Sequence, residues 1–152
     1  MSQASATIKA STNNWVWGAD ATRPRFLHTM IRVRDFDASL RFYVDGLGMK
    51  VLDRFEIEAR RVTAFFIGFG GYEDGGCLEL THLWDVDAYT HGTGYGHIAI
   101  GVPDLPGALA KLEAMGVEVT QRPVKYFADA PHLAFVKDPD GYSVELIQTR
   151  KG

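Results

Sequence analysis

From about residue 26 onward, the chain alternates short apolar runs with polar or glycine-rich breaks. Residues 27–33 form an apolar run with β-branched side chains, which predicts a strand. The next segment has early acidic residues, with Asp37 as the expected cap, and then apolar residues at helical spacing: Leu40, Phe42, Tyr43 and Leu47. Gly46 and Gly48 are expected to end this helix. Strands are predicted over 50–57, 61–69 and 76–82, which gives the local order βαβββ.

The same order then starts again. A strand is predicted over 96–104, a helix over 105–115, and strands over 117–120, 132–136 and 142–148. The sequences of the two halves can be aligned. In their first elements, the alignment places His28 on His97, Val33 on Val102, Asp35 on Asp104 and Leu40 on Leu109. Residues 77–80 fall on residues 143–146 near the ends of the halves. The pattern predicts an α+β fold made of two tandem βαβββ modules.

The domain boundaries follow from this repeat. Residues 25–152 form one domain, with module one over about 25–84 and module two over about 94–150. Residues 1–24 form an N-terminal arm that contains Trp15 and Trp17. Because two tryptophans are costly to leave in water, the arm is expected either to form a poorly ordered tail with a local cluster or to pack on a neighbouring subunit.

Composition and charge narrow the possible partners. The chain has 152 residues and a formal net charge of −3, so it has no basic field for nucleic acid or an anionic membrane. The single cysteine, Cys77, cannot form an internal disulfide, which suits a reducing compartment. No apolar run is typical of a secretory signal or a membrane helix, and the expected location is the cytoplasm.

A histidine and a glutamate recur at matching positions of the two halves. His28 and His97 lie in the first strands, and Glu79 and Glu145 lie between apolar residues in the last strands. An ionised carboxylate in an apolar setting costs several kcal/mol unless a cation compensates it. The pattern therefore predicts one divalent metal held by two nitrogens and two oxygens, a donor set that suits zinc, nickel, cobalt or iron. The histidines without a repeat partner are assigned surface or loop roles: His82, His91 and His132.

Four segments together resemble glyoxalase I, also called lactoylglutathione lyase, of the vicinal oxygen chelate superfamily. They are residues 27–33 (LHTMIRV), 78–81 (LELT), 95–99 (YGHIA) and 134–146 (AFVKDPDGYSVEL). The likeness extends from about residue 26 to residue 148 and leaves out only the arm. It implies that each module forms a curved mixed sheet.

The resemblance also implies a metal site. His28, Glu79, His97 and Glu145 fall on the four metal ligands of that family. Family members pair as homodimers with two active sites at the subunit interface, so His28 and Glu79 of one chain would meet His97 and Glu145 of the other. The short spacing from Glu79 to His97 resembles the compact bacterial form, which implies nickel or cobalt, with zinc as the alternative.

The implied reaction is the isomerisation of the hemithioacetal of methylglyoxal and glutathione to S-lactoylglutathione, which detoxifies methylglyoxal. The metal is a Lewis acid that stabilises an enediolate, while a glutamate moves a proton between neighbouring carbons. We assign Glu145 as the principal base and Glu79 as its counterpart. Glutathione is the cosubstrate and no redox cofactor is required.

The thiol site departs from the family pattern. Arg32 matches the family arginine that pairs with a glutathione carboxylate, and Arg122 or Lys125 is expected to supply a second cation. However, Leu83 stands where the family has an asparagine that helps to hold glutathione, and residues 125–131 depart from its glycine-rich loop.

Alternative functions keep the fold but change the chemistry. One is another enzyme of the superfamily, which would act on a different thiol adduct or catalyse epimerisation or ring-opening oxygenation. Oxygenases would hold iron with two histidines and one carboxylate, and four candidate ligands argue against that reading. Another alternative is a metal-poor module that binds a small molecule.

Overall fold

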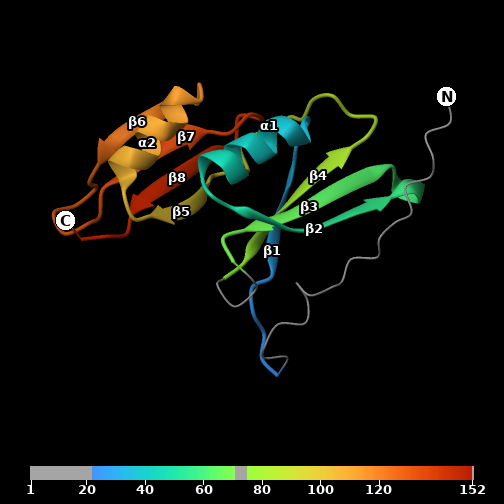
Figure 1. Cartoon of the computed structure of the whole chain (residues 1–152), viewed down its shortest axis with the longest axis horizontal. Helices are drawn as coiled ribbons and strands as arrows, with labels where there is room; N and C mark the ends of the chain where they lie inside the picture. The colour runs from blue at the N-terminus through green and yellow to red at the C-terminus, as the bar shows by residue number, and fades with distance from the viewer. Residues whose placement is uncertain (1–21, 71–74, 152) are drawn as a thin grey trace. The chain divides into compact units, whose positions relative to one another are not determined.

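Two four-stranded mixed sheets form the architecture of the protein. The computed structural model describes residues 22–70 and 75–151, so the predicted arm with Trp15 and Trp17 lies outside the described residues except for its last three. The sheets have the orders β1-β4-β3-β2 and β5-β8-β7-β6 (Figure 1). The prediction of an α+β fold with two tandem βαβββ modules is confirmed.

The first sheet is built from strands β1 to β4. Their bounds are His28–Arg32 for β1, Lys50–Ile57 for β2, Val62–Gly68 for β3 and Cys77–Leu83 for β4. β1 pairs with β4 in parallel, and β4 pairs with β3 and β3 with β2 in antiparallel. A short 3-10 helix, η2 (Glu58–Arg60), joins β2 to β3. β3 and β4 are the internal strands of this sheet, and most of their residues are buried.

The second sheet repeats this plan. It consists of β5 (Ile98–Val102), β6 (Val119–Val124), β7 (Leu133–Lys137) and β8 (Ser143–Gln148). β5 pairs with β8 in parallel, and β8 with β7 and β7 with β6 in antiparallel. The register also repeats, because Ile98 lies opposite Val144 in the same way that Thr29 lies opposite Leu78.

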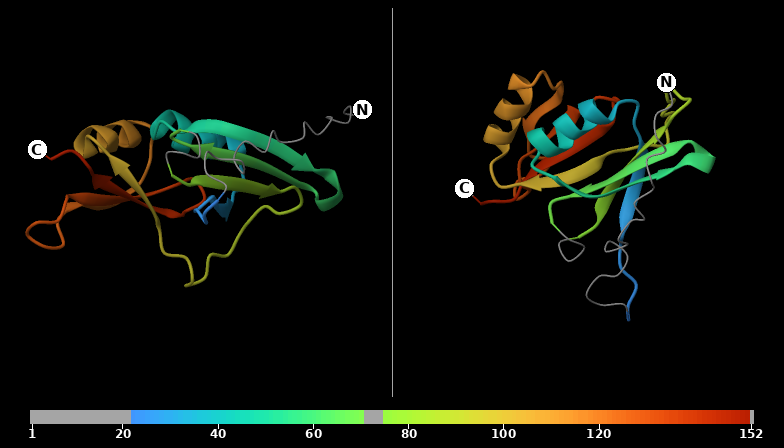
Figure 2. Two further views of the ribbon diagram at one scale, coloured as in Figure 1. Left: turned by 90° about the horizontal axis from the view of Figure 1, so that it is seen from below. Right: turned by 45° about the vertical axis from the view of Figure 1, so that its right-hand side comes forward.

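Helix α2 (Leu105–Ala114) starts at a well-formed cap. The side chain of Asp104 accepts a hydrogen bond from the backbone N–H of Gly107 at 3.0 Å, which satisfies one of the free donors at the start of the helix. Leu105, Leu109 and Leu112 are buried on its inner side. The helix lies over β8 and alongside the helical segment of the first module (Figure 2).

That first helical segment belongs to the second compact unit. The chain divides into one unit of residues up to Phe36 plus residues 48–89, and another of residues 37–47 plus residues from 90 onward. Helix α1 (Phe36–Leu40) continues into a π-helical turn, η1 (Arg41–Gly46). The buried hydroxyl of Tyr43, in η1, donates a hydrogen bond to Asp138 at 2.7 Å. A buried bond between groups so distant in sequence fixes this helix on the second unit.

Three local expectations differ from the structure. Asp37 lies inside α1 rather than capping it, because the helix already starts at Phe36. The strand predicted over 117–120 is β6, which starts two residues later and continues to Val124. His97 lies one residue before β5 rather than within it. Within the described part of the chain, no helix is long and apolar enough to cross a bilayer.

Candidate active site

The first unit brings His28 and Glu79 together. His28 opens β1 and Glu79 lies in the middle of β4, where the parallel register places Glu79 opposite Met30. The Nε2 atom of His28 lies 3.0 Å from Oε2 of Glu79, and the side chains are 27% and 17% exposed. The face of the first sheet that carries His28 and Glu79, which we call the site face, therefore presents an imidazole and a carboxylate that are close together and still partly open to solvent.

The second unit repeats this pair with His97 and Glu145. The Nε2 atom of His97 lies 3.0 Å from Oε2 of Glu145, and these side chains are 44% and 12% exposed. The pairing distance is thus the same in both halves, and in both the histidine presents the same ring nitrogen. The repeat seen in the sequence is therefore also present in the atomic geometry of the two histidine–glutamate pairs.

In the part of the chain that the structure describes, neither pair has a third metal-binding side chain beside it. Among residues 22–70 and 75–151, no group of three or more histidine, cysteine, aspartate or glutamate side chains is placed to hold a metal ion. The two pairs belong to different compact units. The described residues of each unit thus offer two donors by themselves, whereas catalytic metal sites in proteins generally use at least three protein ligands.

Sequence reasoning missed a phenylalanine in each half. Phe66 on β3 lies directly opposite Glu79, and Phe135 on β7 lies directly opposite Glu145. The offset that superposes His28 on His97 also superposes Phe66 on Phe135, so a repeat comparison extended to the third strands would have found both. These rings lie beside the two histidine–glutamate pairs.

The three predicted substrate-binding cations lie in different surroundings. Arg32 ends β1 on the His28 side of the sheet, because side chains alternate along a strand. Arg122 lies on β6 and forms an ion pair with Glu113 of α2. Lys125 follows β6 and lines a cavity of about 550 Å³ in the second unit, together with residues 128–132 and 148–151.

The histidines that were excluded as ligands have structural contacts. The Nδ1 atom of His82 lies 3.0 Å from the carbonyl oxygen of Val33, where β1 has just ended. His91 stacks on Tyr142, with ring centroids 4.1 Å apart. His132 lines the same cavity as Lys125.

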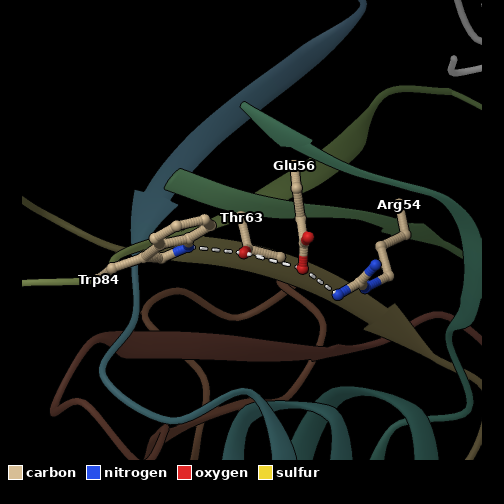
Figure 3. Close-up of polar contacts among 4 residues, drawn as sticks. All are labelled: Arg54, Glu56, Thr63 and Trp84. Carbon is tan, nitrogen blue, oxygen red and sulfur yellow. Dashed lines mark hydrogen bonds and ion pairs between the residues drawn. The ribbon is translucent and has the colours of Figure 1, made fainter. Parts of the chain in front are cut away.

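A chain of polar contacts on the opposite face of the first sheet anchors the segment after β4. The indole N–H of Trp84 donates to Thr63 at 2.9 Å, the Thr63 hydroxyl donates to Glu56 at 3.5 Å, and Glu56 pairs with Arg54 (Figure 3). Thr63 is buried, so these bonds satisfy a polar group inside the unit. The contacts tie the segment that includes Leu83 to β2 and β3.

Two buried groups, the Cys77 thiol in the first unit and the Asp138 carboxyl group in the second, have shifted pKa values. Burial, followed by the charge of Glu79, raises the pKa of the Cys77 thiol to about 11, so this thiol is neutral at physiological pH. Burial also raises the pKa of Asp138 above its ordinary value, although the Tyr43 hydroxyl and two backbone N–H groups, of Asp140 and Tyr142, lower it. Asp138 opens the turn that leads into β8, the strand of Glu145.

The repeated fold agrees with a family comparison. A sequence model of the Glyoxalase/Bleomycin resistance protein/Dioxygenase superfamily matches residues 25–146. The chain belongs to this superfamily. Within the glyoxalase superfamily, it is 44% identical over 127 residues to a protein of Vibrio cholerae serotype O1 named probable lactoylglutathione lyase, and the match covers 84% of this chain and 92% of that protein.

Two further relatives are similar over the same region. A lactoylglutathione lyase of Haemophilus influenzae is 43% identical over 126 residues, which cover 83% of this chain and 93% of the relative. The solved structure of Leishmania major glyoxalase I, described as trypanothione-dependent, has a TM-score of 0.75 and 41% identity. That match covers 83% of this chain and 87% of the Leishmania chain. The resemblance to glyoxalase I stated from the sequence motifs is thereby confirmed.

Proposed function

We propose that the chain is a metal-dependent lactoylglutathione lyase that isomerises the hemithioacetal of methylglyoxal and glutathione to S-lactoylglutathione. The observation that carries the proposal is the histidine–glutamate pair that occurs in both halves with a separation of 3.0 Å. The relatives named lactoylglutathione lyase, at 43–44% identity, support the choice of reaction.

The residues present fit a divalent cation. Two imidazole nitrogens and two carboxylate oxygens are a donor set that binds nickel, cobalt and zinc, and we favour nickel or cobalt. Because each unit offers one pair, we infer that the site combines His28 and Glu79 of one subunit with His97 and Glu145 of a partner. A homodimer would then hold two such sites, related by its two-fold axis.

The glutamates supply the proton chemistry. When bound, the cation supplies Lewis acidity that stabilises the negative charge developing on the substrate oxygens. Glu145 removes the proton from the carbon that bears the hydroxyl group and delivers a proton to the neighbouring carbon, so the reaction has no net loss of atoms or electrons. The Glu145 side chain is the less exposed of the two, and we assign it as the principal base with Glu79 as its counterpart.

In this proposal, cationic side chains bind glutathione through its carboxylates. Arg32 lies on the same face of the sheet as His28, four residues further along β1, and would receive one carboxylate of glutathione. Lys125 is the better candidate for the second carboxylate because Arg122 already pairs with Glu113. Leu83 offers no amide to the thiol, so a larger or differently charged thiol adduct is the second candidate substrate.

A metal-reconstitution assay tests the reaction. The purified protein is loaded separately with nickel, cobalt and zinc, and the ultraviolet absorbance of the thioester product is followed with methylglyoxal plus glutathione. Activity that depends on the metal is expected, and the same assay with trypanothione and other small thiols ranks the cosubstrates. A fully metal-loaded protein that is inactive with every thiol would exclude the lyase.

A mixed-subunit experiment tests the shared site. One variant carries His28→Ala and Glu79→Gln, the other carries His97→Ala and Glu145→Gln, and each homodimer is expected to be inactive. The two variants are then refolded together. In each heterodimer, one of the two sites combines the intact first unit of one variant with the intact second unit of the other. Random pairing then restores about a quarter of the wild-type activity. No recovery in a verified heterodimer would mean that each chain builds its own site.

A further inference from the structure

Each candidate histidine ligand packs edge-on against a phenylalanine. The rings of His28 and Phe66 have centroids 5.3 Å apart and planes at 80°. The rings of His97 and Phe135 have centroids 5.2 Å apart and planes at 76°. Nearly identical T-shaped contacts in two compact units indicate a repeated feature rather than chance packing.

The same phenylalanines also face the glutamates. Phe66 is the direct cross-strand neighbour of Glu79, and Phe135 is the direct cross-strand neighbour of Glu145. Residues directly opposite each other in an antiparallel pair have side chains on the same face of the sheet, in contact distance. Histidine, phenylalanine and glutamate therefore form a three-residue cluster in each unit, which we call the HFE cluster: His28, Phe66 and Glu79 in the first, and His97, Phe135 and Glu145 in the second.

The imidazole ring of a histidine on a strand is free to rotate unless a neighbouring side chain restrains it. Rotation about the bond between Cβ and the ring is broad and roughly two-fold, so the ring can turn its Nε2 atom away from the carboxylate at little cost. A phenyl ring set against the imidazole in the T-shaped arrangement favours one ring plane, and edge-to-face pairs are stabilising beyond their buried area. In both HFE clusters this plane is one in which Nε2 faces the glutamate at 3.0 Å.

The first phenylalanine is itself held firmly. Phe66 is 1% exposed, and Phe55 on β2 packs against it with ring centroids 5.6 Å apart. Phe135 is only partly buried. The support is therefore more rigid in the first unit than in the second, where the His97 side chain is also more exposed than that of His28.

We propose that Phe66 and Phe135 are positioning residues that fix the ring planes of His28 and His97, so that each Nε2 is aimed at the metal position before the ion binds. The inference rests on the proposed function only in taking the histidine–glutamate pairs as metal ligands. It does not depend on which thiol adduct is the substrate. The phenylalanines act through the imidazoles and take no part in the proton transfer.

The test measures metal affinity in Phe66→Leu and Phe135→Leu. Nickel and cobalt dissociation constants are determined by competition with a chromophoric chelator, without substrate. Each substitution is expected to weaken binding roughly 3- to 10-fold, and the double variant more than either single one, because both supported histidines are proposed to bind the same ion. Urea unfolding of the metal-free proteins reports the structural cost separately.

Matched controls separate positioning from general packing. Phe65→Leu alters the neighbouring side chain of β3, which points to the opposite face of the sheet from Phe66 and contacts Phe36. Phe42→Leu alters a buried ring of the second unit that packs on Tyr43. Both controls are expected to lose stability and keep wild-type metal affinity. Phe135→Tyr keeps an aromatic ring at a partly buried site and is expected to restore most of the affinity lost in Phe135→Leu.

The outcomes are distinct. Unchanged affinity in both leucine variants, equal losses in the controls, or a wild-type protein that binds neither metal would each overturn the proposal. If Phe66→Leu does not fold, the Phe135 series alone decides. A wild-type protein that binds metal, loses affinity in the leucine variants and has no lyase activity would contradict the proposed reaction while supporting the positioning role.

Discussion

The two halves of the chain have the same HFE cluster but differ in the residue that lies four positions after the histidine on the same face of the sheet. In the first unit, Arg32 ends the strand that His28 begins, two residues beyond Met30. In the second unit the equivalent position is Gly101, and Ala99 replaces Met30. One half therefore offers a guanidinium on the site face, and the other offers a bare backbone.

The difference separates two requirements of the chemistry. A metal ion bound by two imidazoles and two carboxylates can take one histidine and one glutamate from each of two similar halves. A hemithioacetal of glutathione is not symmetric, so the groups that recognise it need to occur only once per site. Residues that are the same in both halves should therefore matter for metal binding and proton transfer. Residues that differ between the halves, such as Arg32 and Gly101, should matter for substrate recognition.

The largest effect is expected from the two glutamates. Glu145→Gln should lower turnover by roughly 10²- to 10⁴-fold, because the amide cannot accept the substrate proton, while Glu79→Gln should lower it less. Steady-state rates at matched metal content measure the difference. Both variants should remain folded and bind metal more weakly than the wild type. Wild-type turnover in Glu145→Gln would exclude this residue as the base.

The next effect belongs to the arginine that the second half lacks. Arg32→Ala should raise KM for the hemithioacetal roughly 10- to 100-fold, because it removes a charged hydrogen-bond partner of the thiol, and leave kcat and metal affinity nearly unchanged. Arg34→Ala removes an equal charge from a nearby exposed position and is the control. A loss confined to kcat would assign Arg32 to the reaction rather than to binding.

A smaller effect is expected from the buried bond that holds the first module's helix on the second unit. Tyr43→Phe removes the hydroxyl that lowers the pKa of Asp138, so this pKa rises further above its ordinary value of 3.8. A carboxyl group with a raised folded-state pKa favours folding when it is protonated, and its contribution declines as the pH rises through that pKa. The variant should lose about 1–3 kcal/mol at pH 7 and less near pH 4.

Urea unfolding at the two pH values measures this difference. Equal losses at both would show that the ionised carboxylate of Asp138 does not depend on the Tyr43 hydroxyl. Leu109→Ala, which shortens an apolar side chain buried on the inner side of α2, serves as the pH-independent control.

The smallest effect concerns Gly101 itself. A Cβ atom at this position would lie 2.7 Å from Cγ2 of Thr149, so Gly101→Ala should cost about 1 kcal/mol in the free energy of unfolding. Thr149→Ser removes the clashing methyl group, and the double variant should recover most of the loss in thermal or urea unfolding. If it does not, the glycine is needed for a reason other than the close approach of Thr149.

Much of this arrangement can be predicted from the sequence because the repeat is visible in local patterns. The strand over 50–57 agrees with β2 at both ends, and the pairing of His28 with Glu79 follows from their matching places in the first and last strands of a module. Alternation of side chains along a strand also separates His82 from Glu79 correctly. These inferences need only neighbouring residues and a repeat.

The features that could not be predicted depend on distant contacts. The helical pattern after residue 36 does not reveal that its second half is a π-helical turn, nor that it packs in the second unit. That choice depends on Tyr43 finding Asp138, a partner far along the chain. The aromatic supports Phe66 and Phe135 were missed for a different reason: a phenylalanine in a strand is typical of any core, and only their matching places in the repeat set them apart.

The assignment of residues 37–47 to the second unit has a consequence for protein engineering. A fragment cut after residue 89 would carry away a helix whose buried surface belongs to the other fragment, which would in turn expose Leu112 opposite Gly46. Neither piece is then expected to be soluble by itself, whereas two co-expressed fragments could reassociate through the shared helix. Split reporters and circular permutants of this protein should therefore keep residues 37–47 covalently joined to, or co-produced with, the C-terminal half.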